Sequence, residues 1–242
     1  MSQKRASVDR TTYDQAYVRS LFDRIAPRYD FLNHFLSSGF DVLWRNRAIR
    51  TLRDHHPKQI LDVATGTADL AIEAAKLRPE MIVGVDLSSE MIRLGEEKIA
   101  RRGLQALIKL ERASAEELPF PDGSFDAVTV AFGMRNFSNL EAGLAQMYRV
   151  LRSGGVVMIL EFSRPRQVPL KQVYRLYFKR VLPVVGGLIS RSREAYEYLP
   201  RTVAQFPDGD ELLDVLTSIG FTRSRQQSLS CGIATIYTGQ KP

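Results

Sequence analysis

The feature that most constrains the fold is an alternation of short apolar segments with helical ones through the middle of the chain. The apolar segments are rich in β-branched and aliphatic residues, whereas the segments between them show helical spacing or a helix cap. Parallel strands joined by crossover helices are covered on both faces. We therefore predict an α/β, doubly wound sheet, with strands at 59–63, 81–86, 107–111, 125–130 and 156–162 and helices at 67–77, 88–101 and 140–151.

Both ends of the chain depart from this alternation. Residues 12–54 show helical spacing that is broken at Gly39, which predicts an N-terminal helical cap. A helix at 208–219 and strands at 222–229 and 233–239, with a turn at 230–232 between the strands, predict a C-terminal antiparallel hairpin. We therefore expect residues 1–242 to form one Rossmann-like domain with seven mostly parallel strands and a helical insertion at 163–206 after the fifth strand.

The loop after the first expected strand has the composition of a ligand site. Ligands of doubly wound sheets bind beyond the carboxyl ends of the strands. There, Gly66 lies among small residues in the segment Asp62-Val63-Ala64-Thr65-Gly66-Thr67-Ala68-Asp69. The second expected strand ends in Asp86, whose carboxylate can accept hydrogen bonds from a ribose diol. This pattern favours an adenosine-type ligand, although a loop that merely needs small residues is the alternative for this segment alone.

Two adenosine cofactors use this layout, and the loop separates them. A nicotinamide dinucleotide needs the Gly-x-Gly-x-x-Gly pattern, of which only Gly66 is present, and Asp69 would stand beside its pyrophosphate. S-adenosylmethionine has no phosphate and carries a sulfonium, which suits the acidic Asp62 and Asp69. The segment 113–126 also resembles the adenine-binding loop of class I methyltransferases, and we expect Asp126 at its end to be structural. We therefore predict S-adenosylmethionine as the cofactor.

Several stretches carry a resemblance that covers nearly the whole chain after the first dozen residues. The most specific is Phe-Gly-Met-Arg-Asn at 132–136, and others lie at 22–30, 43–45, 147–155, 160–163 and 196–200. Together they resemble the ubiquinone/menaquinone biosynthesis C-methyltransferases. The resemblance implies cofactor contacts at Thr67, Asp86, Ser114 and Ala115, beside the loop residues Asp62, Ala64 and Gly66. Two positions depart from many relatives, which have Gly in place of Ala68 and Asn or Asp in place of Ser114. Ser114 can still form hydrogen bonds, so we expect a changed partner geometry.

The reaction that the resemblance implies is methylation of a ring carbon on a prenylated quinol. The favoured acceptor is demethylmenaquinol, which yields menaquinol, and the alternative is 2-methoxy-6-polyprenyl-1,4-benzoquinol in ubiquinone biosynthesis. A sulfonium methyl group is already electrophilic, so the protein must align methyl and carbon, exclude water and stabilise the developing phenolate. This chemistry requires no metal, and the three histidines, His34, His55 and His56, lack a metal-binding spacing.

Candidate catalytic residues follow the fourth expected strand. Our hypothesis is that Arg135 stabilises the quinol oxygen by its charge and that Asn136 orients it; an ion pair that shapes the loop is the alternative for Arg135. Tyr29 and Asp30 are weaker candidates for the substrate pocket, and Tyr29 is alternatively a core residue. Glu161 is either a proton-transfer group or a buried structural carboxylate.

Positive charge is concentrated in the insertion. The formal net charge is +7, and residues 162–193 hold eight Lys or Arg residues and no Asp or Glu. Aromatic and aliphatic residues are interleaved with them, which suits contact with anionic lipid. Because a prenylated quinol resides in the bilayer, we predict a lid that touches the inner face of the membrane. A basic helix with solvated charges is the alternative.

Other partners and locations are less compatible with the sequence. Base N-methylation of RNA usually shows a Pro-Pro-aromatic motif where this chain has Ala-Phe-Gly-Met-Arg-Asn, and Cys231 is badly placed for RNA C5-methylation. We therefore expect no nucleic-acid partner; a non-catalytic cofactor-binding module is a further alternative. The single cysteine predicts a reducing compartment, the cytoplasm, and no apolar run is long enough for a membrane helix.

Overall fold

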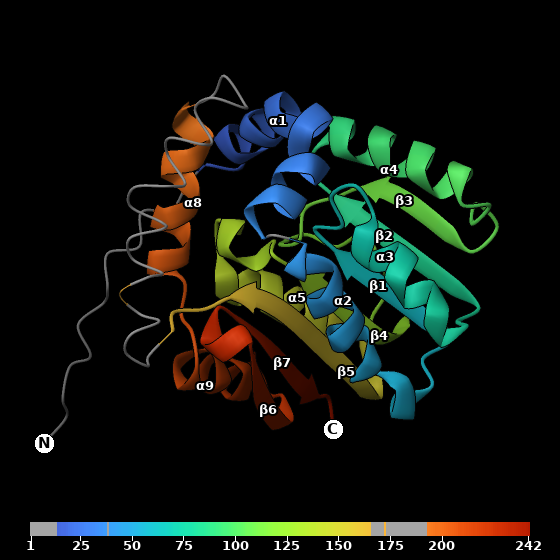
Figure 1. Ribbon diagram of the computed structural model, residues 1–242. Coiled ribbons are helices and arrows are strands. Elements are labelled where there is room, and N and C mark those ends of the chain that lie inside the picture. The colour runs from blue at the N-terminus through green and yellow to red at the C-terminus, as the bar shows by residue number, and fades with distance from the viewer. Residues whose placement is uncertain (1–13, 38, 166–171, 173–192) are drawn as a thin grey trace, which may run out of the picture.

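The centre of the fold is a seven-stranded sheet with the strand order β3-β2-β1-β4-β5-β7-β6 (Figure 1). The computed structural model describes residues 14–37, 39–165, 172 and 193–242. Four strand pairs are parallel, whereas β7 runs antiparallel to both β5 and β6. The predicted sheet and its C-terminal hairpin are thereby confirmed. The strands are β1 (Gln59–Val63), β2 (Met81–Asp86), β3 (Ile108–Arg112), β4 (Phe125–Ala131), β5 (Leu151–Phe162), β6 (Thr222–Leu229) and β7 (Ala234–Gln240).

The fifth strand differs most from its prediction. It begins at Leu151 rather than at residue 156, because Leu151 pairs with Phe125 before the register shifts. Gly154, whose φ is +81°, allows the chain to turn within this extension. The apolar run that the sequence showed is the part of β5 that is buried on both faces.

Two hydrophobic clusters, one on each face of the sheet, form the core. Alternation of side chains along each strand sends Leu61 and Val63 to one cluster and Ile60 to the other. The helices α5 (Leu140–Val150) and α9 (Asp210–Ile219) cover the first face. The opposite face is covered by α2 (Phe40–Arg50), α3 (Asp69–Ala74) and α4 (Ser89–Arg101) (Figure 1).

Local signals explain where several helices begin. Ser88 caps α4 as predicted, because the Met91 N–H donates to Ser88 Oγ at 3.1 Å. Asn139 caps α5 in the same way through the N–H of Ala142. The third helix is shorter than the predicted 67–77 because Ala68 takes a left-handed backbone with φ +65°. Short 3₁₀ turns complete the connections: η1 (Arg53–His55), η2 (Ala75–Leu77), η3 (Met134–Asn136) and η5 (Ser230–Gly232).

Two long helical segments lie outside the sheet layers. The first, α1 (Gln15–Leu36), packs on α4 and α2 and crosses the carboxyl edge of the parallel strands (Figure 1). The second, α8 (Arg193–Gln205), contacts η3. Most of the basic insertion, 166–171 and 173–192, lies outside the described residues. In the parts that the structure describes, no helix is long and apolar enough to cross a membrane.

Asp126 is structural, as the sequence indicated. Its Oδ2 accepts hydrogen bonds from the N–H groups of Lys58 and Gln59 at 2.9 and 2.7 Å, and Arg152 binds its Oδ1 at 2.7 Å. The carboxylate therefore joins the beginnings of β1, β4 and β5 at the edge opposite the site described next.

Candidate functional site

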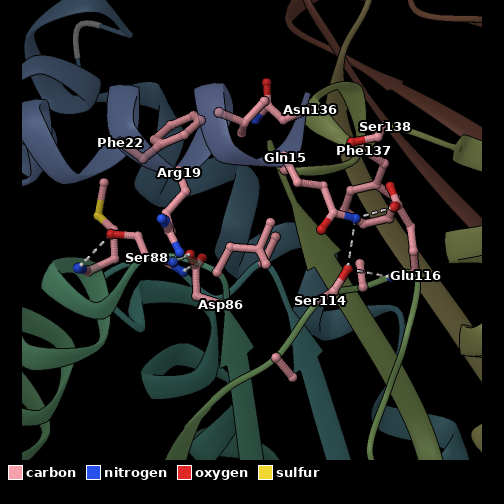
Figure 2. Close-up of a pocket in the computed structure, with 18 of the residues that line it drawn as sticks. Gln15, Arg19, Phe22, Asp86, Ser88, Ser114, Glu116, Asn136, Phe137 and Ser138 are labelled. Atoms are coloured by element: carbon pink, nitrogen blue, oxygen red, sulfur yellow. Dashed lines mark hydrogen bonds between the residues drawn. The ribbon is translucent and has the colours of Figure 1, made fainter. Parts of the chain in front are cut away.

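A cavity lies at the carboxyl edge of the sheet, between strand ends and α1 (Figure 2). It encloses about 690 Å³, including its open mouth. We call this the main cavity. Its floor consists of the loops after β1, β2, β3 and β4, and its roof consists of Gln15, Val18, Arg19 and Phe22 of α1.

The loop after β1 holds a buried carboxyl group beside the floor. Thr65 and Thr129 donate their hydroxyls to the two oxygens of Asp62, at 2.6 and 2.8 Å. Burial raises the pKa of Asp62 to about 6 in spite of these hydrogen bonds. Ala64 and Gly66 have φ values of +53° and +55°, so the loop presents backbone rather than bulky side chains to the cavity. An acidic group beside exposed backbone suits a compact cationic ligand.

Asp86 joins the loop after β1 to the loop after β2. One oxygen accepts the Gly66 N–H at 2.8 Å, and the other accepts the Ser88 N–H at 2.9 Å. Burial raises the pKa of this carboxyl as well. Each carboxylate oxygen can accept a second hydrogen bond. Asp86 can therefore still accept hydrogen bonds from a diol bound in the cavity that it lines.

Ser114 and Ala115 line the cavity from the loop after β3. The amide nitrogen of Gln15 on α1 donates to Ser114 Oγ at 3.2 Å and also to a carboxylate oxygen of Glu116. Figure 2 shows this side chain reaching from the helix to the loop. The structure therefore connects the roof to the segment that was predicted to bind adenine.

A second, smaller hollow of about 380 Å³ adjoins the main cavity, with which it shares Ala64, Gly66, Ala131 and Phe132. Asp62 and Thr67 line this side hollow, so both lie beside the main cavity rather than in its wall.

Asp69 also lines the side hollow, but its charge is balanced within the protein. Lys98 lies 2.6 Å from one of its oxygens, and Arg45 lies 3.2 Å from the other. The expectation that Asp69 contributes negative charge to a ligand therefore needs revision. Asp62 is the carboxyl group of this loop that is not joined to a cation among the described residues.

The structure places the two candidate catalytic residues differently. Asn136 lines the main cavity, and its Oδ1 accepts a hydrogen bond of 3.0 Å from the Tyr198 hydroxyl of α8. Arg135 turns away and forms a buried ion pair with Glu161 at 2.7 Å, while also donating to the Phe132 carbonyl. This geometry corresponds to the alternative that the sequence left open for Arg135, a loop-shaping ion pair.

Two other candidate residues lie outside the part of the site that the structure describes. Tyr29 and Asp30 lie on α1, but their side chains are outside what the structure describes. The described part of the chain contains no group of three or more His, Cys, Asp or Glu side chains that could hold a metal ion.

Several cavity residues were not anticipated from the sequence. The roof residues are one group, and Phe132, Phe137 and Ser138 after β4 are another. The spacing of Gln15, Val18, Arg19 and Phe22 by three or four residues was a usable signal, because it puts them on one helix face. What was missing was the direction in which that face points.

An aromatic cluster borders the cavity on the side of α2. The ring of Phe132 lies 4.6 Å from that of Phe162 and 6.1 Å from that of Trp44, between centroids. Trp44 in turn stacks on Phe40 at 6.2 Å. Aromatic contacts therefore run from a cavity residue, Phe132, to the first residue of α2.

Comparisons with known proteins agree with this architecture. The sequence model of the ubiE/COQ5 methyltransferase family matches residues 10–241. The chain is 49% identical over 226 residues to a demethylmenaquinone methyltransferase of Porphyromonas gingivalis, covering 93% of this chain and 92% of that one. It is 47% identical over 226 residues to the ubiquinone/menaquinone biosynthesis C-methyltransferase UbiE of Geotalea daltonii, covering 93% and 96%.

A solved structure is similar in fold. The crystal structure of a SAM-dependent methyltransferase from Thermotoga maritima matches with a TM-score of 0.64 at 18% identity, covering 93% of this chain and 100% of that one. At this identity the likeness concerns the arrangement of helices and strands alone.

Proposed function

The chain belongs to the ubiE/COQ5 methyltransferase family, and from that premise we propose that it methylates demethylmenaquinol to menaquinol with S-adenosylmethionine. The family resemblance drawn from the sequence is thereby confirmed. A relative named for demethylmenaquinone and another named for both quinones support a prenylated quinol as the acceptor.

The observation that carries the proposal is that one cavity holds both halves of the expected site. Gly66, Asp86 and Ser114 line it at the cofactor end, and Asn136 lines it after β4. A methyl donor and an acceptor ring bound in this cavity would be neighbours. Alignment of two reactants in one water-poor site supplies much of the rate of a methyl transfer.

The residues present fit the cofactor. Asp62 offers a carboxyl group to an ammonium, and Asp86 has acceptor capacity left for a ribose diol. Ser138 Oγ is buried beside the cavity with no hydrogen-bond partner among the described residues, and a ligand atom would satisfy it. When bound, S-adenosylmethionine supplies an electrophilic methyl group, so the protein's tasks are to orient the acceptor and stabilise negative charge on its oxygen.

Asn136 is our candidate for the contact with the quinol oxygen. Tyr198 already donates to its Oδ1, so the amide nitrogen is the remaining donor of this side chain. Phe132 borders the same space with an apolar surface for the ring. We assign Arg135 a positioning role, because its pair with the fully buried Glu161 fixes the η3 turn that presents Asn136.

A pair of variants separates this role from direct charge stabilisation by Arg135. Arg135→Ala lowers turnover by orders of magnitude under both hypotheses. Glu161→Gln frees the guanidinium from its partner, so turnover would be kept or raised if Arg135 acted directly on the quinol. We expect Glu161→Gln instead to lower kcat at least tenfold with cofactor affinity unchanged.

Methyl transfer to reduced demethylmenaquinol, measured beside 2-methoxy-6-polyprenyl-1,4-benzoquinol, tests the acceptor. We expect transfer to the naphthoquinol to be the faster of the two, and a loss of at least 100-fold in Asn136→Ala. Faster transfer to the benzoquinol would replace the proposed substrate by the alternative. Transfer to neither quinol, with S-adenosylmethionine still bound, would refute the proposal.

A bilayer-resident acceptor also requires access to the membrane. We propose that the protein is cytoplasmic and contacts the inner face of the membrane peripherally. The charge of the insertion at 163–206 supports this, since its segment up to residue 193 pairs eight basic residues with aromatic and aliphatic ones.

A further inference from the structure

One end of α2 exposes apolar side chains that the methyltransferase site does not use. Phe40, Val42 and Leu43 are 48%, 47% and 63% exposed, and they are the large hydrophobic residues with such exposure among those described. All three lie in the first turn of the helix. Scattered exposed apolar residues are ordinary, but a contiguous group indicates an interaction surface.

The remainder of the same helix face is basic. Leu43, Arg47 and Arg50 follow one another at spacings of four and three residues, which places them along one line of the helix, and both arginines are exposed. Neither arginine forms an ion pair with any residue that the structure describes. The one acidic residue of α2, Asp41, is buried against Arg45. Exposed acidic charge nearby comes from Asp54, just beyond the helix, beside Arg53, which is also exposed.

We propose that this outer face of α2, formed by Phe40, Val42, Leu43, Arg47 and Arg50, docks on an anionic phospholipid bilayer. Apolar side chains at one end would enter the acyl boundary, and the arginines would contact phosphates. A second copy of the chain fits less well, because a two-fold contact through this face brings like charges together.

The position of this face connects docking on the bilayer with access to the cavity. Phe40 stacks on Trp44, and Trp44 packs on Phe132, which lines both the main cavity and the side hollow. The contact therefore brings the apolar border of the cavity close to the lipid. This part of the argument rests on the proposed function, in which the acceptor carries a prenyl tail.

The chain contains its own probe for this contact. Trp44 is its only tryptophan and lies directly beneath Phe40. We expect vesicles of phosphatidylcholine and phosphatidylglycerol to bind the full-length protein, and brominated acyl chains to quench its Trp44 emission. Binding without quenching would mean that another surface docks, and would overturn the proposal.

Substitutions separate the apolar and the charged parts. Leu43→Glu should reduce vesicle binding at least tenfold. Arg47→Glu with Arg50→Glu should reduce it at least tenfold on anionic vesicles only. The matched control is Arg101→Glu with Arg102→Glu at the far end of α4, which changes net charge equally and exposes no new surface. An equal loss in the control would indicate unspecific attraction and overturn the proposal.

Two further measurements complete the test. Methyl transfer to a short-tailed, water-soluble demethylnaphthoquinol should be unchanged in Leu43→Glu, so failure of the docking is distinguishable from failure of the proposed function. Light scattering should give the same mass for the wild type and Leu43→Glu. A wild-type dimer that this substitution dissociates would assign the face to a second copy instead.

Discussion

The floor and the roof of the main cavity are held in place by different kinds of contact. Floor residues are held by hydrogen bonds inside the sheet body, as when Asp86 accepts the N–H groups of Gly66 and Ser88. The roof is the helix α1, which forms side-chain hydrogen bonds with the loops below it. Gln15 of the helix donates to Ser114, and Asp23 of the helix accepts from Ser88. Changes in the floor should therefore affect folding as well as function, whereas changes in the roof should affect binding alone.

The buried pair at the end of β5 is expected to show the largest effect. Glu161→Ala leaves the guanidinium of Arg135 buried without its carboxylate, which should lower the free energy of unfolding by about 3–5 kcal/mol. Urea denaturation measures this. Glu96→Ala on the exposed side of α4 is the control, with an expected loss below about 0.5 kcal/mol. A loss under about 1 kcal/mol in Glu161→Ala would show that this ion pair does not hold the loop after β4 in the floor.

The pH dependence of stability tests Asp62. The pKa of its carboxyl is about 6 in the folded protein, against an ordinary value of 3.8, so the folded state binds the proton more tightly than the unfolded state. The corresponding stabilisation is present below about pH 3.8 and is lost as pH rises through 6, on the order of 3 kcal/mol. Unfolding of the ligand-free protein between pH 4.5 and 7.5 should show this slope, and Asp62→Asn should lack it. Parallel slopes in both proteins would assign the effect to other groups.

Contact between two floor loops predicts an intermediate loss of stability that a second substitution should reverse. A Cβ on Gly133 would lie 2.5 Å from that of Ala64, so Gly133→Ala must push the loops apart. We expect a loss of about 1–3 kcal/mol in thermal or urea unfolding, together with weaker cofactor binding. Ala64→Gly removes the clashing atom at a backbone of φ +53°, which suits glycine. The double variant should recover most of the loss in stability. If the effects of the two substitutions on the free energy of unfolding simply added, the two loops would not be in the close contact described.

The roof should give the smallest effect on folding. Gln15→Ala removes the contact with Ser114 and Glu116 at the end of α1, and we expect stability to change by less than about 0.5 kcal/mol. Cofactor affinity, measured by calorimetry, should fall about threefold to tenfold, because one hydrogen bond contributes on the order of 1 kcal/mol. A stability loss comparable with that of Glu161→Ala would erase the distinction between floor and roof.

The same division explains what could be predicted from the sequence. The positions of Gly66, Asp86 and Ser114 follow from strand ends, and strand ends are visible in a local alternation of residues. The partner of Arg135 is not local, because Glu161 meets it only after β4 and β5 have paired. The roof depends on the angle at which α1 crosses the sheet edge. That angle is set by packing on α4 and α2 rather than by any residue pattern within α1.

The place of β7 has a consequence for biosynthesis. Its residues leave the ribosome well after those of β5, yet they pair with β5 in the interior of the sheet and separate β5 from β6. Until then, the strongly apolar β5 carries an open edge that can pair with other chains. A nascent or prematurely terminated polypeptide is therefore a natural client for chaperones that shield strands. Termination before β7 should lead to aggregation rather than to a slightly shortened enzyme.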